Sequence, residues 1–227
     1  IGNVISRGNP LIENILNNNL RYQSGPEWLY ENILNDKWVL AVAGTHGKTS
    51  TSSMLAWILE SNGLAPGFLI GGIPKNFKVS ARLPTSSKKN FPSFFVIEAD
   101  EYDTSFFDKR SKFVHYRPKT LILNNLEFDH ADIFENINHI EKHFHHLVRT
   151  IPKIGKIIFN NKSNSIKRVI KMGCWSDLED FGGTGKWSYR KINDNEFKIS
   201  FKRKIQGSVK WDLIGHHNSL NALAAIA

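Results

Sequence analysis

The stretch AVAGTHGKTSTSSML, residues 41–55, decides the fold of this chain, because it joins a strand to a helix through a glycine loop. The run KWVLAVAG (37–44) is apolar and ends at a glycine, which predicts a buried strand of a parallel sheet. The following segment predicts a helix ending at Gly63, since apolar side chains recur on one face: Met54, Leu55, Ile58 and Leu59. Backbone N–H groups and the positive end of the helix dipole converge at such a loop, so we expect it to bind phosphate.

Two side chains of the loop have expected roles in nucleotide binding. Lys48 would reach the terminal phosphates, and the Thr49 hydroxyl would bind Mg²⁺. The common pattern G-x-x-x-x-G-K-[ST] would place its first glycine at Val42, so only the shorter form G-T-H-G-K-T is present. The alternative is a chance strand-to-helix turn that contains a lysine, and the agreement of the flanking strand and helix patterns argues against it.

Composition limits the class of protein. At 227 residues and 41% hydrophobic, the chain can bury a sizeable core, as one large domain or one domain with part of another. Its single cysteine, Cys174, excludes a disulfide framework and predicts a reducing compartment, the cytoplasm. No signal peptide and no apolar run near the ~18 residues of a membrane span is found. The chain begins without Met and stops within a helical pattern, so we expect a piece of a longer enzyme.

The formal net charge of +9 invites a nucleic-acid hypothesis. The lysines are scattered, however, and the chain has no arginine-rich run and no basic strand interleaved with aromatic residues. Anionic nucleotide substrates, or a bias toward lysine and asparagine, explain the charge as well. We therefore expect no nucleic-acid partner and no membrane partner.

The pattern of strands and helices divides the chain at residue 36. Residues 1–36 carry two short helical patterns and are expected to be a connector or the tail of a preceding domain. Residues 37–227 are expected to form an α/β domain with a mainly parallel sheet flanked by helices, the longest from about 133 to 148. Residues 186–213 alternate apolar and polar side chains and predict a small added antiparallel sheet. Further strands are predicted at GFLIGG (67–72), SFFVIEA (93–99), TLILNN (120–125) and GKIIFN (155–160).

An acidic cluster follows the strand SFFVIEA and consists of Glu98, Asp100, Glu101 and Asp103. The carboxyl ends of parallel strands are where an open α/β sheet binds its ligand. A carboxylate at that position can complete the ligand shell of the Mg²⁺ that Thr49 holds. The alternative is an ordinary acidic loop, whose mutual repulsion Lys109 and Arg110 could offset.

A second polar cluster follows the strand TLILNN, with Asn124, Asn125, Glu127, Asp129 and His130. Oxygen donors and one imidazole at a strand end suit a second divalent cation, although a lone loop histidine is more often solvated or hydrogen-bonded. A competing zinc site would use three histidines on one helix face. We interpret these as a surface stripe: His139, His143 and His146.

In this order, four segments resemble the central ATPase domain of the Mur ligases, the ATP-dependent amino-acid and peptide ligases of peptidoglycan synthesis. They are G-T-H-G-K-T (44–49), E-A-D-E-Y-D (98–103), N-N-L-E-F-D-H (124–130) and G-H-H-N-S-L-N-A (215–222). The resemblance covers essentially the whole chain. Tyr102 stands where the L-alanine-adding members typically have serine. The resemblance therefore implies joining UDP-N-acetylmuramate to the recycled murein tripeptide L-alanyl-γ-D-glutamyl-meso-diaminopimelate, and the alternative is addition of L-alanine to the same substrate.

The resemblance also implies residue roles. Lys48, Glu98 and His130 would be catalytic: Thr49 and Glu98 would hold a first Mg²⁺, and His130 a second that bridges the γ-phosphate and the substrate carboxylate. Asn218 and Asn221, with His217 beside them, would contact the adenine of ATP. The implied phosphate-binding set is Gly44, Thr45, His46, Gly47, Lys48, Thr49 and Ser50.

The implied reaction converts a carboxylate to an acyl phosphate, which the amine of the incoming peptide then attacks. A uridine-binding domain would precede this chain and a domain contacting ATP and the amine would follow it, so we expect no ligation by residues 1–227 alone. Three other classes of protein are alternatives to a Mur ligase. A GTPase or small-molecule kinase would share the loop, but the guanine-reading N-K-x-D is absent from this chain. A nucleotide-binding regulatory module would not need His130. Folate polyglutamate-adding ligases are disfavoured by the quoted segments.

Overall fold

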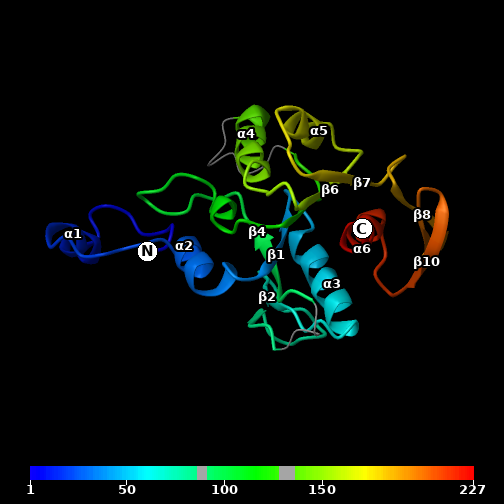
Figure 1. Cartoon of the computed structure of the whole chain (residues 1–227), viewed down its shortest axis with the longest axis horizontal. Helices are drawn as coiled ribbons and strands as arrows, with labels where there is room; N and C mark the ends of the chain where they lie inside the picture. The colour runs from blue at the N-terminus through cyan, green and yellow to red at the C-terminus, as the bar shows by residue number, and fades with distance from the viewer. Residues whose placement is uncertain (86–90, 128–135) are drawn as a thin grey trace.

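A computed structural model describes residues 1–85, 91–127 and 136–227. Within these residues ten strands form one sheet (Figure 1). They are β1 (Trp38–Ala43), β2 (Gly67–Leu69), β3 (Ala81–Arg82), β4 (Phe94–Ala99), β5 (Thr120–Leu123), β6 (Lys156–Asn160), β7 (Asp177–Phe181), β8 (Trp187–Asn193), β9 (Glu196–Phe201) and β10 (Lys204–Lys210). Their order across the sheet is β10-β9-β8-β7-β6-β5-β1-β4-β2-β3, which places β1 in the interior.

Helices flank this sheet and precede it. They are α1 (Pro10–Asn17), α2 (Gly25–Leu29), a π-helical turn (Tyr30–Leu34), α3 (Lys48–Ser61), a 3-10 helix (Lys112–His115), α4 (Ile137–Val148), α5 (Asn164–Lys171) and α6 (His216–Ile226). Among the residues described, every helix is too short or too polar to cross a bilayer. The predicted helix at 133–148 is confirmed from Ile137 onward, and its first residues lie outside the described part of the chain.

The sheet is parallel over its central part, as predicted. β1 pairs in parallel with β4 and with β5, so that Val42 lies beside Glu98 on one side and Ile122 on the other. The antiparallel strands β8, β9 and β10 are also present, but they extend the main sheet through the pair Phe181–Trp187 and do not form a sheet of their own. A hydrogen bond from the Gly182 N–H to the Trp187 carbonyl, 2.9 Å long, holds this junction.

Alternate residues of β1 enter two different cores. Val39 and Ala41 belong to the core that α4 and α5 cover, whereas Leu40 and Val42 belong to the core that α3 and α6 cover. Figure 1 shows the two helix pairs on different sides of the strands. A strand buried on both faces reads as a continuous apolar run, which is why its sequence lacks alternation.

The two cores locate a topological switch point. The chain leaves β1 through α3 on one face, and it reaches α4, on the opposite face, from the neighbouring strand β5. In open α/β sheets a ligand binds outside the carboxyl ends of the strands at the point where the connections diverge. The β1 and β5 ends therefore form the expected site, and residues 44–47 and 124–127 lie there.

Residues 1–36 lie beside the sheet and contribute no strand within the described chain. Figure 1 shows α1 away from the sheet, with α2 between them. A capping box begins α2: the Ser24 Oγ accepts from the Glu27 N–H at 3.3 Å, and the Glu27 carboxylate accepts from the Ser24 N–H at 3.0 Å. Pro26 lies in the first turn of this helix. The connector role of residues 1–36 stays a prediction.

The packing of α4 gives a test of the core. Phe144 is 1% exposed and its ring centroid lies 5.4 Å from that of Phe113. Phe144→Ala should lower the free energy of unfolding by about 3–5 kcal/mol, because it leaves a cavity between α4 and the sheet. Urea unfolding followed by circular dichroism measures this. Ile154→Ala, at a side chain that is 76% exposed, is the control and should change little; equal losses in both variants would contradict the assigned core.

Candidate active site at the phosphate loop

The loop between β1 and α3 depends on glycine at two positions. Gly44 has φ +146° and Gly47 has φ +79°, a region that residues with a side chain rarely adopt. A Cβ on Gly47 would also lie 2.6 Å from Asn221 Oδ1 and 2.7 Å from Asn124 Nδ2. Gly47 is the N-cap of α3, so the first N–H groups of that helix, which have no partner within the helix, face the loop.

The end of β5 holds the loop in place. The His46 N–H donates to Asn125 Oδ1 at 2.7 Å, and Asn125 Nδ2 donates back to the His46 carbonyl at 2.8 Å. The Thr45 N–H donates to the Asn125 carbonyl at 3.2 Å, and the Thr45 hydroxyl accepts from the Glu127 N–H at 3.0 Å. These reciprocal bonds fix the loop backbone from the neighbouring strand.

A buried amide pair supports the loop from beneath. Asn124 Nδ2 donates to Asn221 Oδ1 at 2.7 Å, and it lies 3.2 Å from the His46 carbonyl. Asn124 and Asn221 are 2% and 5% exposed. Asn221 comes from α6, so this pair ties the last helix to the loop. The adenine contact of Asn221 stays a prediction; here its side-chain oxygen is used under Gly47.

Lys48 lies between the loop and the acidic cluster. Its Nζ donates to the Gly44 carbonyl at 2.8 Å and to Glu101 Oε2 at 3.3 Å, and it lies 3.9 Å from Asp100 Oδ1. Glu101 is buried, whereas Asp100 is partly exposed. The cation thus remains at the mouth of the loop with its charge balanced by carboxylates.

The structure brings together Thr49 and Glu98, the pair that the family resemblance implied. The Glu98 carboxylate accepts hydrogen bonds from the Thr49 hydroxyl and from the Gly71 N–H, the latter at 3.0 Å. Burial raises the pKa of Glu98, and these two hydrogen bonds oppose that shift. A hydroxyl and a carboxylate are the oxygen donors that Mg²⁺ prefers, so this pair fits the proposed ion.

Of the two basic partners predicted for the acidic cluster, one is confirmed and the other is wrong. Lys109 Nζ lies 2.9 Å from Asp103 Oδ2, which confirms the predicted partner. The second predicted partner was wrong: Arg110 pairs with Asp108 at 2.7 Å, because its backbone and side chain both turn toward that carboxylate.

The other residues predicted to bind nucleotide or metal do not form one cluster with Lys48, Thr49 and Glu98 in the described part of the chain. Ser50 lines a cavity of about 530 Å³ together with Thr49 and apolar side chains of α3, α6 and β10. His217 is exposed, and Asn218 Nδ2 donates to the Ile214 carbonyl at 2.9 Å. His130 lies outside the described residues, so its metal role stays a prediction.

The three histidines of α4 are not grouped as metal ligands within the described chain. Their rings follow one another along the helix, edge-on for His139–His143 and tilted for His143–His146, with centroids 4.9 and 5.9 Å apart. His143 Nδ1 lies 2.7 Å from the hydroxyl oxygen of the buried Ser111. One member of the stripe is therefore engaged with the protein rather than with solvent.

A family model, the Mur ligase middle domain, matches residues 42–227. The chain belongs to the Mur ligase family.

Individual Mur ligases resemble this chain to different degrees. The Escherichia coli (strain K12) protein named UDP-N-acetylmuramate–L-alanyl-γ-D-glutamyl-meso-2,6-diaminoheptandioate ligase is 55% identical, over 100% of this chain and 49% of its own length. The crystal structure of the ligase of corresponding name from Neisseria meningitides is 57% identical with a TM-score of 0.94, covering 100% of this chain and 71% of that one. The UDP-N-acetylmuramate–L-alanine ligase of Endomicrobium trichonymphae is 30% identical over 98% of this chain and 47% of that protein. The chain thus spans about half the length of the curated relatives it matches.

In the site of this Mur ligase domain, three residues have contacts that the sequence did not predict. Gly72 packs against the loop so closely that a Cβ would lie 2.9 Å from Thr49 Cγ2, and Asn124 and Glu101 contact the loop as described above. The signals were present: a glycine pair after one predicted strand, an asparagine pair after another, and a second glutamate in E-A-D-E. Their partners are 73 or more residues away for Asn124 and 53 for Glu101, so spacing alone could not assign them.

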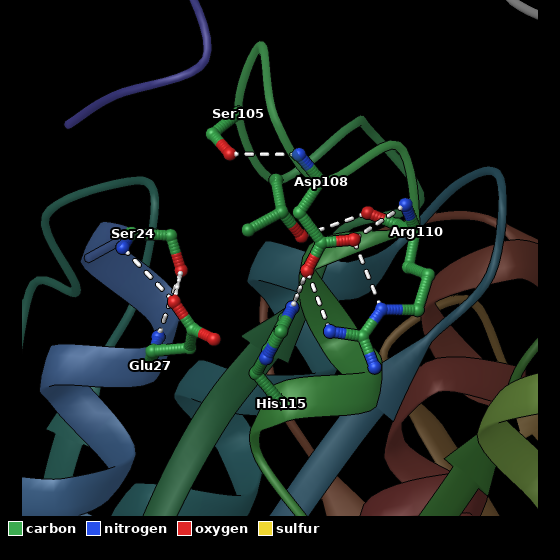
Figure 2. A network of polar contacts seen from close by, with 7 residues as sticks. Ser24, Glu27, Ser105, Asp108, Arg110 and His115 are labelled. Carbon is green, nitrogen blue, oxygen red and sulfur yellow. Dashed lines mark hydrogen bonds and ion pairs between the residues drawn. The ribbon is translucent and has the colours of Figure 1, made fainter. Parts of the chain in front are cut away.

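A second cluster in the described chain has the side chains of a metal site: Glu27, Asp108 and His115 (Figure 2). Each carboxylate already has partners, because Glu27 accepts from Ser24 and Asp108 accepts two hydrogen bonds from the Arg110 guanidinium, at 2.9 and 2.7 Å. His115 Nε2 lies 3.0 Å from Asp108 Oδ2. We interpret the cluster as a link between α2 and the 3-10 helix.

The phosphate loop yields a direct test. Gly47→Ala should lower the free energy of unfolding by about 1–3 kcal/mol, because alanine is strained at φ +79°. Its Cβ also enters the Asn124–Asn221 contact, so ATP affinity should fall. Thermal unfolding and calorimetric ATP titration measure the two effects. Gly207→Ala is the matched control, since its Cβ meets nothing within 4 Å; a Gly47→Ala protein as stable as this control would contradict the assigned loop geometry.

The Asp108–His115 cluster predicts a pH dependence. Burial lowers the pKa of His115, so below its ordinary pKa of about 6.5 the unfolded chain takes up the proton more readily and stability falls. The Arg110 guanidinium lowers the pKa of Asp108, whose contribution to stability is lost only below about pH 4. His115→Gln should therefore flatten the decline in Tm between pH 7.5 and pH 5.5. His217→Gln, at an exposed residue, serves as control, and a decline steeper in His115→Gln than in the parent would be inconsistent with the assignment.

Proposed function

We propose that the full-length parent of this chain is an ATP-dependent ligase that joins UDP-N-acetylmuramate to L-alanyl-γ-D-glutamyl-meso-diaminopimelate, in peptidoglycan recycling. Mur ligases are ATP-dependent. The observation that carries the proposal is the meeting of Lys48, Thr49 and Glu98 at the switch point of the sheet. The choice of substrate is supported by 55% identity to a relative whose name carries this reaction, against 30% to an L-alanine ligase.

The residues of the loop suit transfer of a phosphoryl group to a carboxylate. A carboxylate is a poor electrophile, so the ligase must first form an acyl phosphate with the γ-phosphoryl group of ATP. Lys48 and the N–H groups at the start of α3 neutralise charge on the transferring group. The amine of the tripeptide then attacks the acyl carbon, loses a proton and expels inorganic phosphate, which leaves the new amide.

Metal ions would be held by side chains from several strand ends. Thr49 and Glu98 would hold the first Mg²⁺, and His130 a second one. When bound, these ions neutralise the phosphate charge and orient the reacting oxygens. The adenine side of ATP would be contacted by His217, Asn218 and Asn221. Asn221 would then contact the adenine in addition to its hydrogen bond with Asn124 beneath the loop.

The described chain would supply the ATP-binding part of this enzyme. We propose that residues 37–227 are the central domain and residues 1–36 the connector, and that the rest of the parent's length supplies the uridine-binding domain and the domain that contacts the amine. Residues 1–227 alone should then bind nucleotide without ligating. The lone Cys174 agrees with a reducing compartment, and we place the reaction in the cytoplasm.

Phosphate release by the full-length parent tests the function. With ATP, Mg²⁺ and UDP-N-acetylmuramate, release should be fast with the tripeptide and slow with free L-alanine. Lys48→Ala should lower the rate by about 10²–10³-fold, because a preorganised cation is lost from the transition state. A preference for free L-alanine would assign the parent to the L-alanine-adding reaction instead. Silence with both acceptors would reject both ligase assignments.

A further inference from the structure

We infer that Glu101 is a positioning residue, which fixes the Lys48 ammonium at the mouth of the phosphate loop so that one N–H is left for the transferring phosphoryl group. The inference rests on the proposed ligase function and adds a residue to it. None of the roles implied by the family resemblance involves Glu101. What assigns it is the geometry around Lys48 Nζ.

The ammonium of a lysine has three N–H donors and no acceptor. At Lys48, one donor is used by the Gly44 carbonyl at 2.8 Å and another by Glu101 Oε2 at 3.3 Å. The third remains for an oxygen in the loop. Because two bonds from different directions fix the ammonium, the flexible lysine side chain loses its freedom before ATP arrives rather than during the reaction.

The sheet places the Glu101 carboxylate beside the loop. β1 and β4 are paired in parallel with Ala43 next to Ala99, so the segments that follow the two strands leave the sheet side by side. Gly44 follows Ala43 directly, and Glu101 lies two residues beyond Ala99. The lysine therefore bridges two neighbouring strand ends, which the pairing of β1 with β4 holds together.

The two glutamates of E-A-D-E have different partners. Glu98 contacts the Thr49 hydroxyl and the Gly71 N–H, and Glu101 contacts Lys48. The motif thus serves the metal and the lysine with separate carboxylates. A single carboxylate would have to be shared between the ion and the ammonium, and it could fix neither.

Asp100 provides an internal comparison. Its Oδ1 lies 3.9 Å from Lys48 Nζ and its side chain is 41% exposed, whereas Glu101 is at 3.3 Å and 3% exposed. Both residues are acidic, but solvent screens the charge of Asp100. At 3.9 Å, Asp100 is also too far from the ammonium for a direct hydrogen bond. If only the net charge near Lys48 mattered, the two residues would be equivalent. Positioning makes Glu101 the more important one.

The test uses the full-length parent with Glu101→Gln, and Asp100→Asn as matched control. Glutamine has the same shape and removes the charge that fixes the ammonium, so kcat for tripeptide-dependent phosphate release should fall about 10–100-fold. The Kd for MgATP, from calorimetry, should stay within about threefold or tighten, because a negative charge near the phosphates is gone. Asp100→Asn should lower kcat less than Glu101→Gln does, because solvent screens the charge of Asp100.

A fall in kcat without a loss of MgATP affinity separates positioning from a structural role. A Glu101→Gln protein with the kcat of the parent overturns the inference, and so does one whose Tm, kcat and MgATP affinity all fall together. If Glu101→Gln does not fold, Glu101→Asp carries the test: its charge is kept but its reach is shorter, so kcat should fall at unchanged Tm, and a parent-like kcat overturns the inference. A parent protein inactive with the tripeptide would instead reject the proposed function.

Discussion

The hydrogen bond between Asn124 and Asn221 under Gly47 is the contact on which the site depends. It joins the end of β5, the loop after β1 and the middle of α6 at one buried point. An unpaired amide at that depth would cost free energy, so each partner requires the other. The space beneath the loop is filled by these two side chains, and only a glycine fits above them. The phosphate loop is therefore shaped by a helix that begins about 170 residues later in the chain as much as by its own sequence.

Around this point, the sheet divides the chemistry among strand ends. β1 supplies the loop with Lys48 and Thr49, β4 supplies Glu98 and Glu101, and β5 supplies the asparagines that hold the loop backbone. Because neighbouring parallel strands end at the same edge, groups that are 50 to 100 residues apart in the chain meet without a long loop between them. The glycine pair after β2 completes the arrangement by allowing the backbone to approach Thr49 and Glu98 closely.

The segment before β1 is attached to this framework by polar and aromatic contacts rather than by a shared apolar core alone. Asp108, Arg110 and His115 form one network of ion pairs, and the Glu27 carboxylate of α2 lies within 4.8 Å of Asp108 and His115 (Figure 2). The Arg117 guanidinium donates to the Tyr30 hydroxyl at 3.3 Å and lies 4.4 Å above the Tyr30 ring. These contacts are the kind that fix an orientation, because hydrogen bonds and cation–π pairs are directional. The residues that resemble a metal site thus have a structural explanation in the attachment of α2.

The sequence by itself determined the local elements: the apolar strand before Gly44, the helix after Gly47, and the strands that bring Glu98 and Asn124 to one edge of the sheet. These follow from periodicity and from the rule that parallel strands end at one edge, and both are written in short stretches of chain. The tertiary structure decided which carboxylate holds Lys48, that Arg110 turns to Asp108, that Asn221 lies beneath the loop, and that the antiparallel strands continue the main sheet. Those choices depend on strand order and on which buried polar groups find partners, and no local pattern records either.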